Sequence, residues 1–347
     1  MRFALLRNQL SEDFKNALQC FESGSFEEAE DRFYGMLKQD PTNADTLYFL
    51  RLIERRLMPP PPPGPTSLIW QVDPAKMWEG DWVRTIISGC FSVEVVDGKW
   101  TATAPRMIVV DNGLVEHKVS YYRAAFYRGA RIALVHLSDE AFRDDTLAYR
   151  YCETVLRNYH SEILAVSTGI HFFPLGYKAG FARPNPERRP ASKRRYLWSF
   201  AGDAKKSSRG PMLEAMKSLP RGFLHLTQGF GSGDSLSTGD YRALLDDSIF
   251  VPCPGGWSNL ESFRVYEALE AGAIPIVERR PAFDYFTALL GAHPIPTVGS
   301  WNEAVRLVKG LSPEVMESLG ALCYDWWCEY KRRLKTDLSA IVTRALA

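Results

Sequence analysis

The residues with the clearest chemical potential lie between positions 248 and 277, which read SIFVPCPGGWSNLESFRVYEALEAGAIPIV. This order predicts an apolar strand, a turn at Gly255 and Gly256, a helix and a second apolar strand. Backbone N–H groups and the positive end of the helix dipole would then point at one place, which suits a phosphate group. Ser258 and Glu261 have the spacing of a capping box, so we expect the helix to begin near Asn259.

Arg264 and Glu267 are three residues apart and share one face of the predicted helix. An arginine can bind a diphosphate through two N–H groups, and a glutamate can accept hydrogen bonds from both hydroxyls of a ribose. The alternative is an ion pair on an exposed helix, which stabilises a helix by about 0.2–0.5 kcal/mol. Spacing alone leaves both interpretations open.

The same segment resembles the donor domain of exostosin-type glycosyltransferases, in which a cysteine-proline-glycine loop precedes serine, arginine and a glutamate-alanine-leucine triplet. The residues that carry this resemblance are Cys253, Pro254, Gly255, Ser262, Arg264, Glu267, Ala268, Leu269, Gly272, Ile274 and Pro275. Residues 133–181 are similar to the ribitol xylosyltransferase-like subgroup at His136, Asp139, Glu140, Arg157, Asn158, Tyr159, Pro174, Leu175, Gly176 and Tyr177. Residues 196–212 resemble the first strand and loop of the donor domain at Phe200, Gly202 and Arg209.

The resemblance implies an α/β protein of the GT-B fold, in which two Rossmann-like domains face a cleft and the last helix crosses back to the first domain. It implies a UDP-sugar donor and transfer of a hexosyl or pentosyl group, with inversion, to a glycan or polyol-phosphate acceptor. The donor-binding residues that it implies are Gly202, Arg209, Pro254, Gly255, Gly256, Ser262, Arg264 and Glu267.

The elements that must position these residues alternate between short apolar stretches and helical ones. We expect strands at 106–110, 131–137, 170–173, 196–201, 248–253 and 273–277, and helices at 141–159, 210–218, 262–271, 300–309 and in the tail 312–347. This alternation predicts parallel sheets covered on both faces, with functional residues at the carboxyl ends of the strands. The two predicted domains are 66–190 and 191–347.

Residues 1–58 are predicted to be helical and resemble a tetratricopeptide repeat. One such repeat cannot bury its own apolar face, so this segment would pack on the rest of the chain, on another subunit, or on a peptide partner. Residues 59–65 read PPPPPGP, and polyproline predicts an extended linker.

Two further observations bear on the mechanism. The chain contains no Asp-x-Asp motif, which metal-dependent transferases use, so we expect a metal-independent enzyme without a cofactor. Arg264, the glycine turn and Arg209 would then stabilise the departing diphosphate. Many retaining GT-B enzymes carry a second glutamate eight residues before the ribose-binding one; that position is Asn259 here, which favours inversion.

An inverting transfer needs a base on the acceptor side of the cleft. Asp139 and Glu140 directly follow the predicted strand 131–137 and are the first candidates, and Asp111 is the next. The alternative for Asp139 and Glu140 is capping of a following helix.

Candidate acceptor-binding residues are His136, Arg157, Tyr177 and Lys178. The position of His136 in a buried strand favours a core histidine over an acceptor-binding one, and Arg157 could instead pair with Glu153. A second glycine-rich stretch, 229–235, suggests a flexible loop over the donor.

The composition excludes several other classes. The chain has 347 residues, 46% of them hydrophobic and 24% charged, and a net charge of +1, which does not favour nucleic acid or an anionic membrane. No stretch approaches the roughly 18 apolar residues of a membrane span. We therefore expect a cytoplasmic protein, of a bacterial type that builds surface polysaccharide, unlike Golgi members of the family. The alternatives are an inactive glycosyltransferase-like scaffold acting through residues 1–58, and a sugar-nucleotide epimerase.

Overall fold

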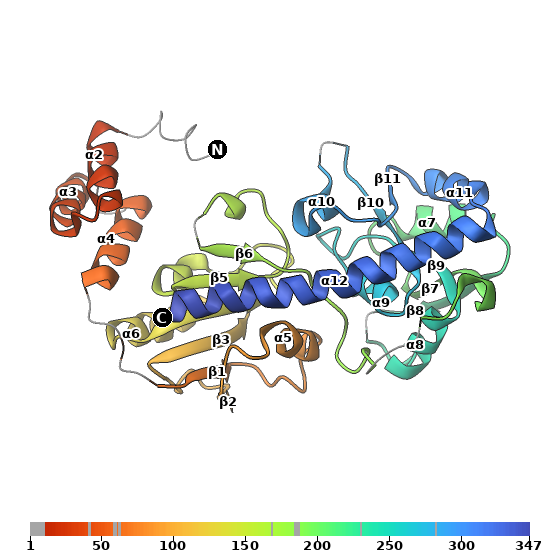
Figure 1. The fold of residues 1–347 in the computed structure, drawn as a ribbon, viewed down its shortest axis with the longest axis horizontal. Helices are drawn as coiled ribbons and strands as arrows, with labels where there is room; N and C mark the ends of the chain where they lie inside the picture. Colours follow the sequence, from red (N-terminus) through yellow and green to blue (C-terminus); the bar gives the residue numbers. More distant parts are fainter. Residues whose placement is uncertain are drawn as a thin grey trace.

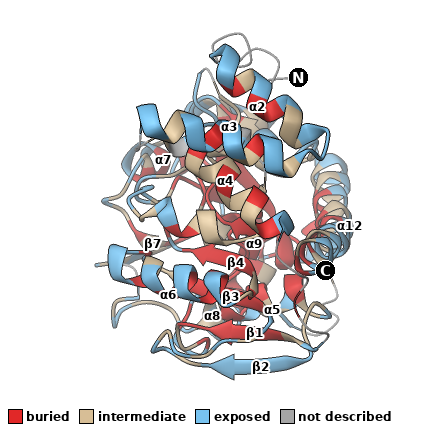
Figure 2. Cartoon of the chain, turned by 90° about the vertical axis from the view of Figure 1, so that its left-hand side faces the viewer, coloured by how far each residue is buried: buried red, intermediate tan, exposed pale blue. Residues whose placement is uncertain are grey.

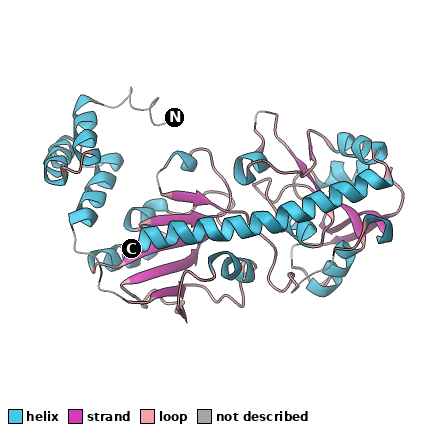
Figure 3. Ribbon diagram, viewed as in Figure 1, coloured by secondary structure: helices cyan, strands magenta, loops and turns pink. Residues whose placement is uncertain are grey.

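The computed structural model describes residues 11–40, 43–57, 61, 64–167, 169–183, 188–229, 231–281 and 283–347. Two parallel sheets lie side by side, with one long helix running along both (Figures 1 and 3). This arrangement agrees with the α/β fold and the two Rossmann-like domains that the sequence analysis expected.

The first sheet has the strand order β2-β1-β3-β4-β5-β6, and all its neighbours are parallel. Its strands are β1 (Thr66–Trp70), β2 (Val93–Val96), β3 (Arg106–Asn112), β4 (Arg131–Leu137), β5 (Thr154–Arg157) and β6 (Ile170–Phe172). Side chains alternate between two buried clusters, one on each face, which explains why β3 and β4 read as continuous apolar runs. Figure 2 shows β2 exposed at the edge.

The second sheet has the order β11-β10-β9-β7-β8, also parallel throughout. Its strands are β7 (Tyr196–Asp203), β8 (Gly222–Thr227), β9 (Ser248–Cys253), β10 (Ile274–Glu278) and β11 (Thr297–Val298). All six strands expected from the sequence are present, and the two sheets fall within the two predicted domain ranges.

Helices cover both sheets. Those of the first half are α5 (Gly80–Ile87), α6 (Glu116–Tyr127) and the 3-10 turns η1 (Thr146–Tyr151) and η2 (Leu164–Val166). Those of the second half are η3 (Ala191–Lys193), α7 (Arg209–Met216), α8 (Thr238–Asp246), α9 (Phe263–Glu270), α10 (Tyr285–Leu290) and α11 (Trp301–Gly310).

The predicted helix at 141–159 is wrong. Only the 3-10 turn η1 forms there, and β5 follows it. The side chains of β5 are all buried, and its backbone pairs with β4 on one side and β6 on the other. Burial on both faces of a central strand therefore outweighs the helical propensity of the residues around it.

Helix α12 (Pro313–Leu346) joins the two halves, as the resemblance implied. It contacts α9 and β10 of the second half and α5, β4 and β5 of the first. The Trp327 ring lies between Trp82 of α5, at 5.6 Å between ring centroids, and Tyr266 of α9, at 5.5 Å. Its indole N–H donates to Glu270 Oε2 at 2.8 Å.

The N-terminal helices α2 (Glu12–Glu22), α3 (Phe26–Gln39) and α4 (Ala44–Leu57) form the helical segment that we expected. They share a small core that includes Phe14, Phe33 and Ile53. This segment packs on the first half through Arg55, which pairs with Glu153 and donates to the carbonyl of Ala130 at 2.9 Å. Its resemblance to a tetratricopeptide repeat stays a prediction.

The predicted linker 59–65 falls mostly outside the described residues, which include only Pro61, Gly64 and Pro65 of it. Among the described residues, no helix combines the length and the apolar character that crossing a bilayer requires.

Candidate active site

A cavity of about 330 Å³ lies between the two halves. The first half contributes residues that follow β4, β5 and β6 and residues just before α5. The second half contributes the ends of β7 and β8, the loop after β9 and the first turns of α9. Ligands of open parallel sheets bind at this carboxyl edge of the strands, so the cavity lies where substrates are expected.

Arg264 and Arg209 line the cavity on the donor side. Arg264 Nη2 donates to the carbonyl of Ala201 at 2.8 Å, and Arg209 Nη1 donates to the carbonyl of Asp203 at 2.8 Å. The Nε atoms of both arginines are buried without a hydrogen-bond partner. Burial, and then the neighbouring Arg264, lower the pKa of Arg209 to about 10, so Arg209 remains cationic at neutral pH.

Gly202 lies between these two guanidinium groups. A Cβ atom at this position would lie 2.9 Å from Arg264 Nη2 and 3.9 Å from Arg209 Nη1, and the backbone φ is +144°. Glycine therefore allows two like charges to converge on one place. An anion with several acceptor oxygens would satisfy their unpaired N–H groups.

Glu267 faces the cavity one turn after Arg264 and is only 5% exposed. Burial raises the pKa of its carboxyl to about 7, although the nearby Arg264 acts in the opposite direction. Its Oε1 accepts a hydrogen bond from the backbone N–H of Lys178 at 3.4 Å. Arg264 and Glu267 thus lie on one helix face, as their spacing predicted, and this face points into the cavity rather than to solvent.

The helix that follows the glycine turn begins later than expected. Its first residue is Phe263 and its N-cap is Ser262, so the predicted start near Asn259 is wrong. Glu261 does not close a capping box, because its buried carboxylate accepts hydrogen bonds from Leu175 N at 2.6 Å, Tyr266 Oη at 2.5 Å and Tyr285 Oη at 2.6 Å. Ser262 Oγ is buried beside the cavity without a partner.

The N–H groups in and just after the glycine turn already donate hydrogen bonds within the protein. Gly256 N donates to Asn259 O at 2.8 Å, and the N–H groups of Ser258 and Asn259 donate to Glu140 Oε1 at 2.8 and 3.1 Å. Gly256 lines the cavity, whereas Pro254 and Gly255 are buried behind it. The N–H groups that we expected to hold a phosphate are therefore taken at these positions.

Glu140 and Asp139, the two predicted bases, lie in different surroundings. Glu140 lines the cavity and binds the turn of the other half. Asp139 is 6% exposed and lies outside the cavity wall. Its carboxylate pairs with Arg157 at 3.1 Å and accepts from the backbone N–H of Arg143 at 2.8 Å. The helical turn that follows, η1, is capped by the side chain of Asp145, so neither Asp139 nor Glu140 caps it.

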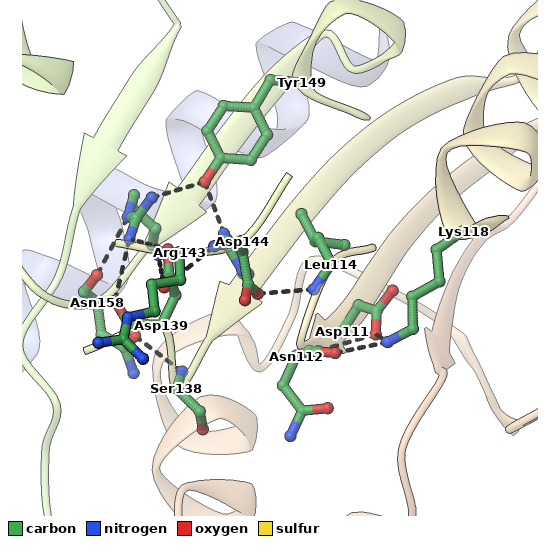
Figure 4. A network of polar contacts seen from close by, with 12 residues as sticks. Asp111, Asn112, Leu114, Lys118, Ser138, Asp139, Arg143, Asp144, Tyr149 and Asn158 are labelled. Atoms are coloured by element: carbon green, nitrogen blue, oxygen red, sulfur yellow. Dashed lines mark hydrogen bonds and ion pairs between the residues drawn. The ribbon is translucent and has the colours of Figure 1, made fainter. Parts of the chain in front are cut away.

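Arg157 and His136, predicted to bind the acceptor, belong to the same buried network as Asp139. Figure 4 labels Asp139, Asp144 and Tyr149 of this network. Arg157 Nη1 donates to the Tyr149 hydroxyl at 2.8 Å. The His136 ring joins that hydroxyl, at 2.6 Å, to Asp144 Oδ2, at 2.8 Å. Neither Arg157 nor His136 lines the cavity, and both are buried in this network.

The predicted pairing of Arg157 with Glu153 is wrong because both residues belong to the β5 region rather than to one helix. Glu153 instead pairs with Arg55 and Arg131. Asp111, the reserve candidate for the base, is completely buried, and its carboxylate pairs with Lys118 at 2.9 Å. Both side chains are labelled in Figure 4.

Lys178 lines the cavity, and its Nζ lies 4.1 Å from the centroid of the Trp78 ring. Tyr177, its neighbour, points away and packs against Trp82, with ring centroids 5.3 Å apart. At the opposite rim, Trp257 is 72% exposed and faces Lys206. The rim of the cavity thus carries one lysine and one tryptophan from each half.

Several cavity residues carry no signal in the sequence. Glu79 and Trp78 from the first half, and Lys206 and Trp257 from the second, all line the wall. Two other lining residues, Ser138 and Tyr159, follow β4 and β5 and have backbone φ of +65° and +61°, in the left-handed region. Non-glycine residues in this region gather at functional sites.

In the part of the chain that the structure describes, one group of side chains has the residue types of a metal site. His136, Asp139 and Asp144 have potential ligand atoms within 4.8 Å of one another. The Arg157 guanidinium is bound to Asp139, and a cation placed there would be repelled by it. This group is therefore better described as a hydrogen-bonded network than as a metal site.

Comparison with known proteins agrees with the two-sheet fold. Residues 179–346 match the family model described as the RXYLT1 C-terminal domain. HepE from Anabaena, solved in complex with UDP and glucose, is similar in fold with a TM-score of 0.52 and 9% identity, over 81% of this chain and 100% of that one. No curated protein matches the chain.

Two further solved structures are similar at lower scores. An α1,3-fucosyltransferase has a TM-score of 0.48 and 10% identity over 79% of this chain and 91% of that one. A mutant O-GlcNAc transferase from Thermobaculum terrenum has a TM-score of 0.48 and 11% identity over 96% and 82% of the two chains.

Proposed function

We propose that this chain, a glycosyltransferase of the GT-B fold, transfers a sugar from a UDP-sugar to a hydroxyl of a glycan or polyol-phosphate acceptor, with inversion and without a metal. The observation that carries the proposal is the pair of arginines around Gly202, Arg209 and Arg264, each with a buried Nε that has no hydrogen-bond partner. The buried Glu267 lines the same side of the cavity. The proposed setting is synthesis of bacterial surface polysaccharide.

In the donor site, Arg264 and Arg209 bind the diphosphate, and Ser262 Oγ offers a further hydrogen bond. Glu267 accepts hydrogen bonds from the ribose hydroxyls. Two guanidinium groups in a partly enclosed site can neutralise the charge that develops on the departing UDP. The UDP seen with HepE, which has the same fold, is consistent with this choice of nucleotide.

The acceptor would enter from the rim. Lys178 and Trp78 from the first half provide a cation and an aromatic face there, which suit an anionic group and a sugar ring respectively. The acceptor oxygen then attacks the anomeric carbon on the side opposite the diphosphate, and a carboxylate of the first half takes its proton.

Calorimetry with UDP tests the donor site. Arg264→Ala and Glu267→Ala should each weaken binding by about 1.5–3 kcal/mol, because a hydrogen bond to a charged group is lost. Arg183→Ala is a suitable control, since Arg183 pairs with Asp246 outside the cavity. Unchanged affinity in both site variants would overturn the assignment.

A chain that binds no uridine nucleotide at all would instead support the alternative function, an inactive scaffold that acts through its N-terminal helices.

A further inference from the structure

Glu79 has an unusual position for a buried carboxylate. It occupies the N-cap of α5 but makes no capping hydrogen bond with its side chain. Oε1 instead accepts from the Ser138 hydroxyl at 3.0 Å, whereas Oε2 is buried and has no partner. The residue is 3% exposed and lines the cavity. The carboxylate of Glu79 therefore neither caps its own helix nor forms an ion pair.

The partner that holds Glu79 lies at the edge of the sheet where chemistry is expected. Ser138 directly follows β4 and has φ of +65°. Its backbone N–H donates to Asn158 Oδ1, after β5, at 3.2 Å. Because these bonds hold Ser138 between two strand ends, they also fix the carboxylate of Glu79 on the acceptor side of the cavity.

Only two carboxylates of the first half line the cavity, among the residues that the structure describes there. Glu140 already accepts two backbone hydrogen bonds from the turn of the other half, through the same oxygen. An added proton would weaken that contact between the halves. Glu79 has no comparable commitment on Oε2. Burial also raises the pKa of Glu79 above its usual value, which strengthens it as a base near neutral pH.

We infer that Glu79 is the general base of the proposed transfer, and that Glu140 is a positioning residue that fixes the turn after β9 against the first half. This inference rests on the proposed function. In the step, the acceptor oxygen forms a bond to the anomeric carbon, and its proton moves to Glu79 Oε2. The bond from the anomeric carbon to the diphosphate oxygen breaks, and UDP leaves with that electron pair.

Donor cleavage with water as the acceptor provides the test, since the same base would act on a water molecule. The wild-type chain is assayed for UDP release from UDP-glucose, UDP-galactose, UDP-N-acetylglucosamine and UDP-xylose, and the substrate that reacts is used for the variants. Glu79→Gln should lower kcat by about 10²–10⁴-fold, because base catalysis contributes that much. Its affinity for UDP, measured by calorimetry, should stay within twofold of the wild type.

Two variants complete the design. Glu79→Asp keeps a carboxylate and should retain at least tenfold more activity than Glu79→Gln, which a merely structural role would not produce. Glu94→Gln serves as the control, since Glu94 binds Trp70 and Arg84 near the sheet edge, outside the cavity wall, and should leave kcat unchanged.

The outcomes separate the two proposals. If Glu79→Gln folds, binds UDP and keeps more than a tenth of the wild-type kcat, Glu79 is not the base. If Glu140→Gln rather than Glu79→Gln abolishes cleavage, the roles of the two residues are reversed and the inference fails. If the wild type neither binds UDP nor cleaves any of the four donors, the proposed function fails, and this inference fails with it.

Discussion

Both halves of the chain place charged side chains at the carboxyl ends of parallel strands, but they satisfy these charges differently. In the first half, Asp139 pairs with Arg157 and Asp111 pairs with Lys118, and both ion pairs are buried. In the second half, Arg209 and Arg264 each keep a buried Nε without a partner. The first set completes its interactions within the protein, whereas the second leaves N–H groups that would pair with the diphosphate in the proposed function.

The difference indicates a division of labour between stability and binding. Internal ion pairs in the first half hold the loops after β4 and β5 in place. Breaking such a pair is costly, because it leaves an unpaired charge in the protein interior. Unpaired groups in the second half lower the stability of the free protein and increase its affinity for a ligand that pairs with them. Substitutions in the two regions should therefore affect different measurements.

The largest expected effect is on stability, in the first half. Arg157→Leu leaves Asp139 buried without its partner and should reduce the free energy of unfolding by about 3–5 kcal/mol. Urea denaturation measures this loss, and the folded fraction should bind UDP normally. Adding Asp139→Asn should restore part of the stability. A cost below about 1 kcal/mol would contradict the comparison.

A substitution in the second half should act on binding instead. Gly202→Ala introduces a Cβ that would lie 2.9 Å from Arg264 Nη2, at a backbone φ of +144° that side chains disfavour. We expect UDP affinity to fall about tenfold, or about 1.4 kcal/mol, because Arg264 must move. Gly310→Ala, at an exposed glycine of the second half that lies outside the cavity wall and whose Cβ would meet open space, is the matched control. Equal affinities for the two variants would show that Arg264 does not contact UDP.

The raised pKa of Glu267 predicts a pH dependence with a definite sign. Its carboxyl titrates near pH 7 in the free protein, against an ordinary value of 4.5. Its stabilising contribution is therefore fully present below about pH 4.5 and is lost as the pH rises through about 7.

UDP binding should respond in the opposite sense, because ribose hydroxyls donate to the ionised form. UDP affinity should decrease about tenfold from pH 8 to pH 6. Calorimetry across this range measures it, and Glu267→Gln should remove the dependence on this group. A flat profile in the wild type would place Glu267 outside the ribose site.

The smallest effect is expected at the rim. Trp257 is 72% exposed, and Lys206 Nζ lies 5.4 Å from the centroid of its ring. Trp257→Ala should change the free energy of unfolding by no more than about 0.5–1 kcal/mol. UDP affinity should stay within threefold of the wild type. A larger loss of affinity would extend the donor site to this rim.

Residues within a contiguous motif could be predicted from the sequence, whereas residues brought together by distant contacts could not. Arg264, Glu267, Gly202 and Arg209 all line the cavity, and each belongs to a recognisable stretch. Glu79 could not be foreseen, because its environment depends on Ser138, 59 residues away in sequence.

The errors in the fold have a similar cause. β5 is four residues long, and its identity depends on pairing with β4 and β6 rather than on its own pattern. Helix α9 begins later than predicted because the Glu261 carboxylate accepts hydrogen bonds from Tyr266 and Tyr285 instead of capping the helix. Local propensity describes neither interaction.

Helix α12 packs on both halves and so fixes their positions relative to each other. At about 1.5 Å per residue, its 34 residues extend over about 51 Å. One residue inserted after Lys335 would rotate Leu338, Val342 and Leu346 by about 100° away from their buried positions, whereas Trp327 would stay in place. The spacing of the two halves around the cavity therefore depends on the residue count of this one helix.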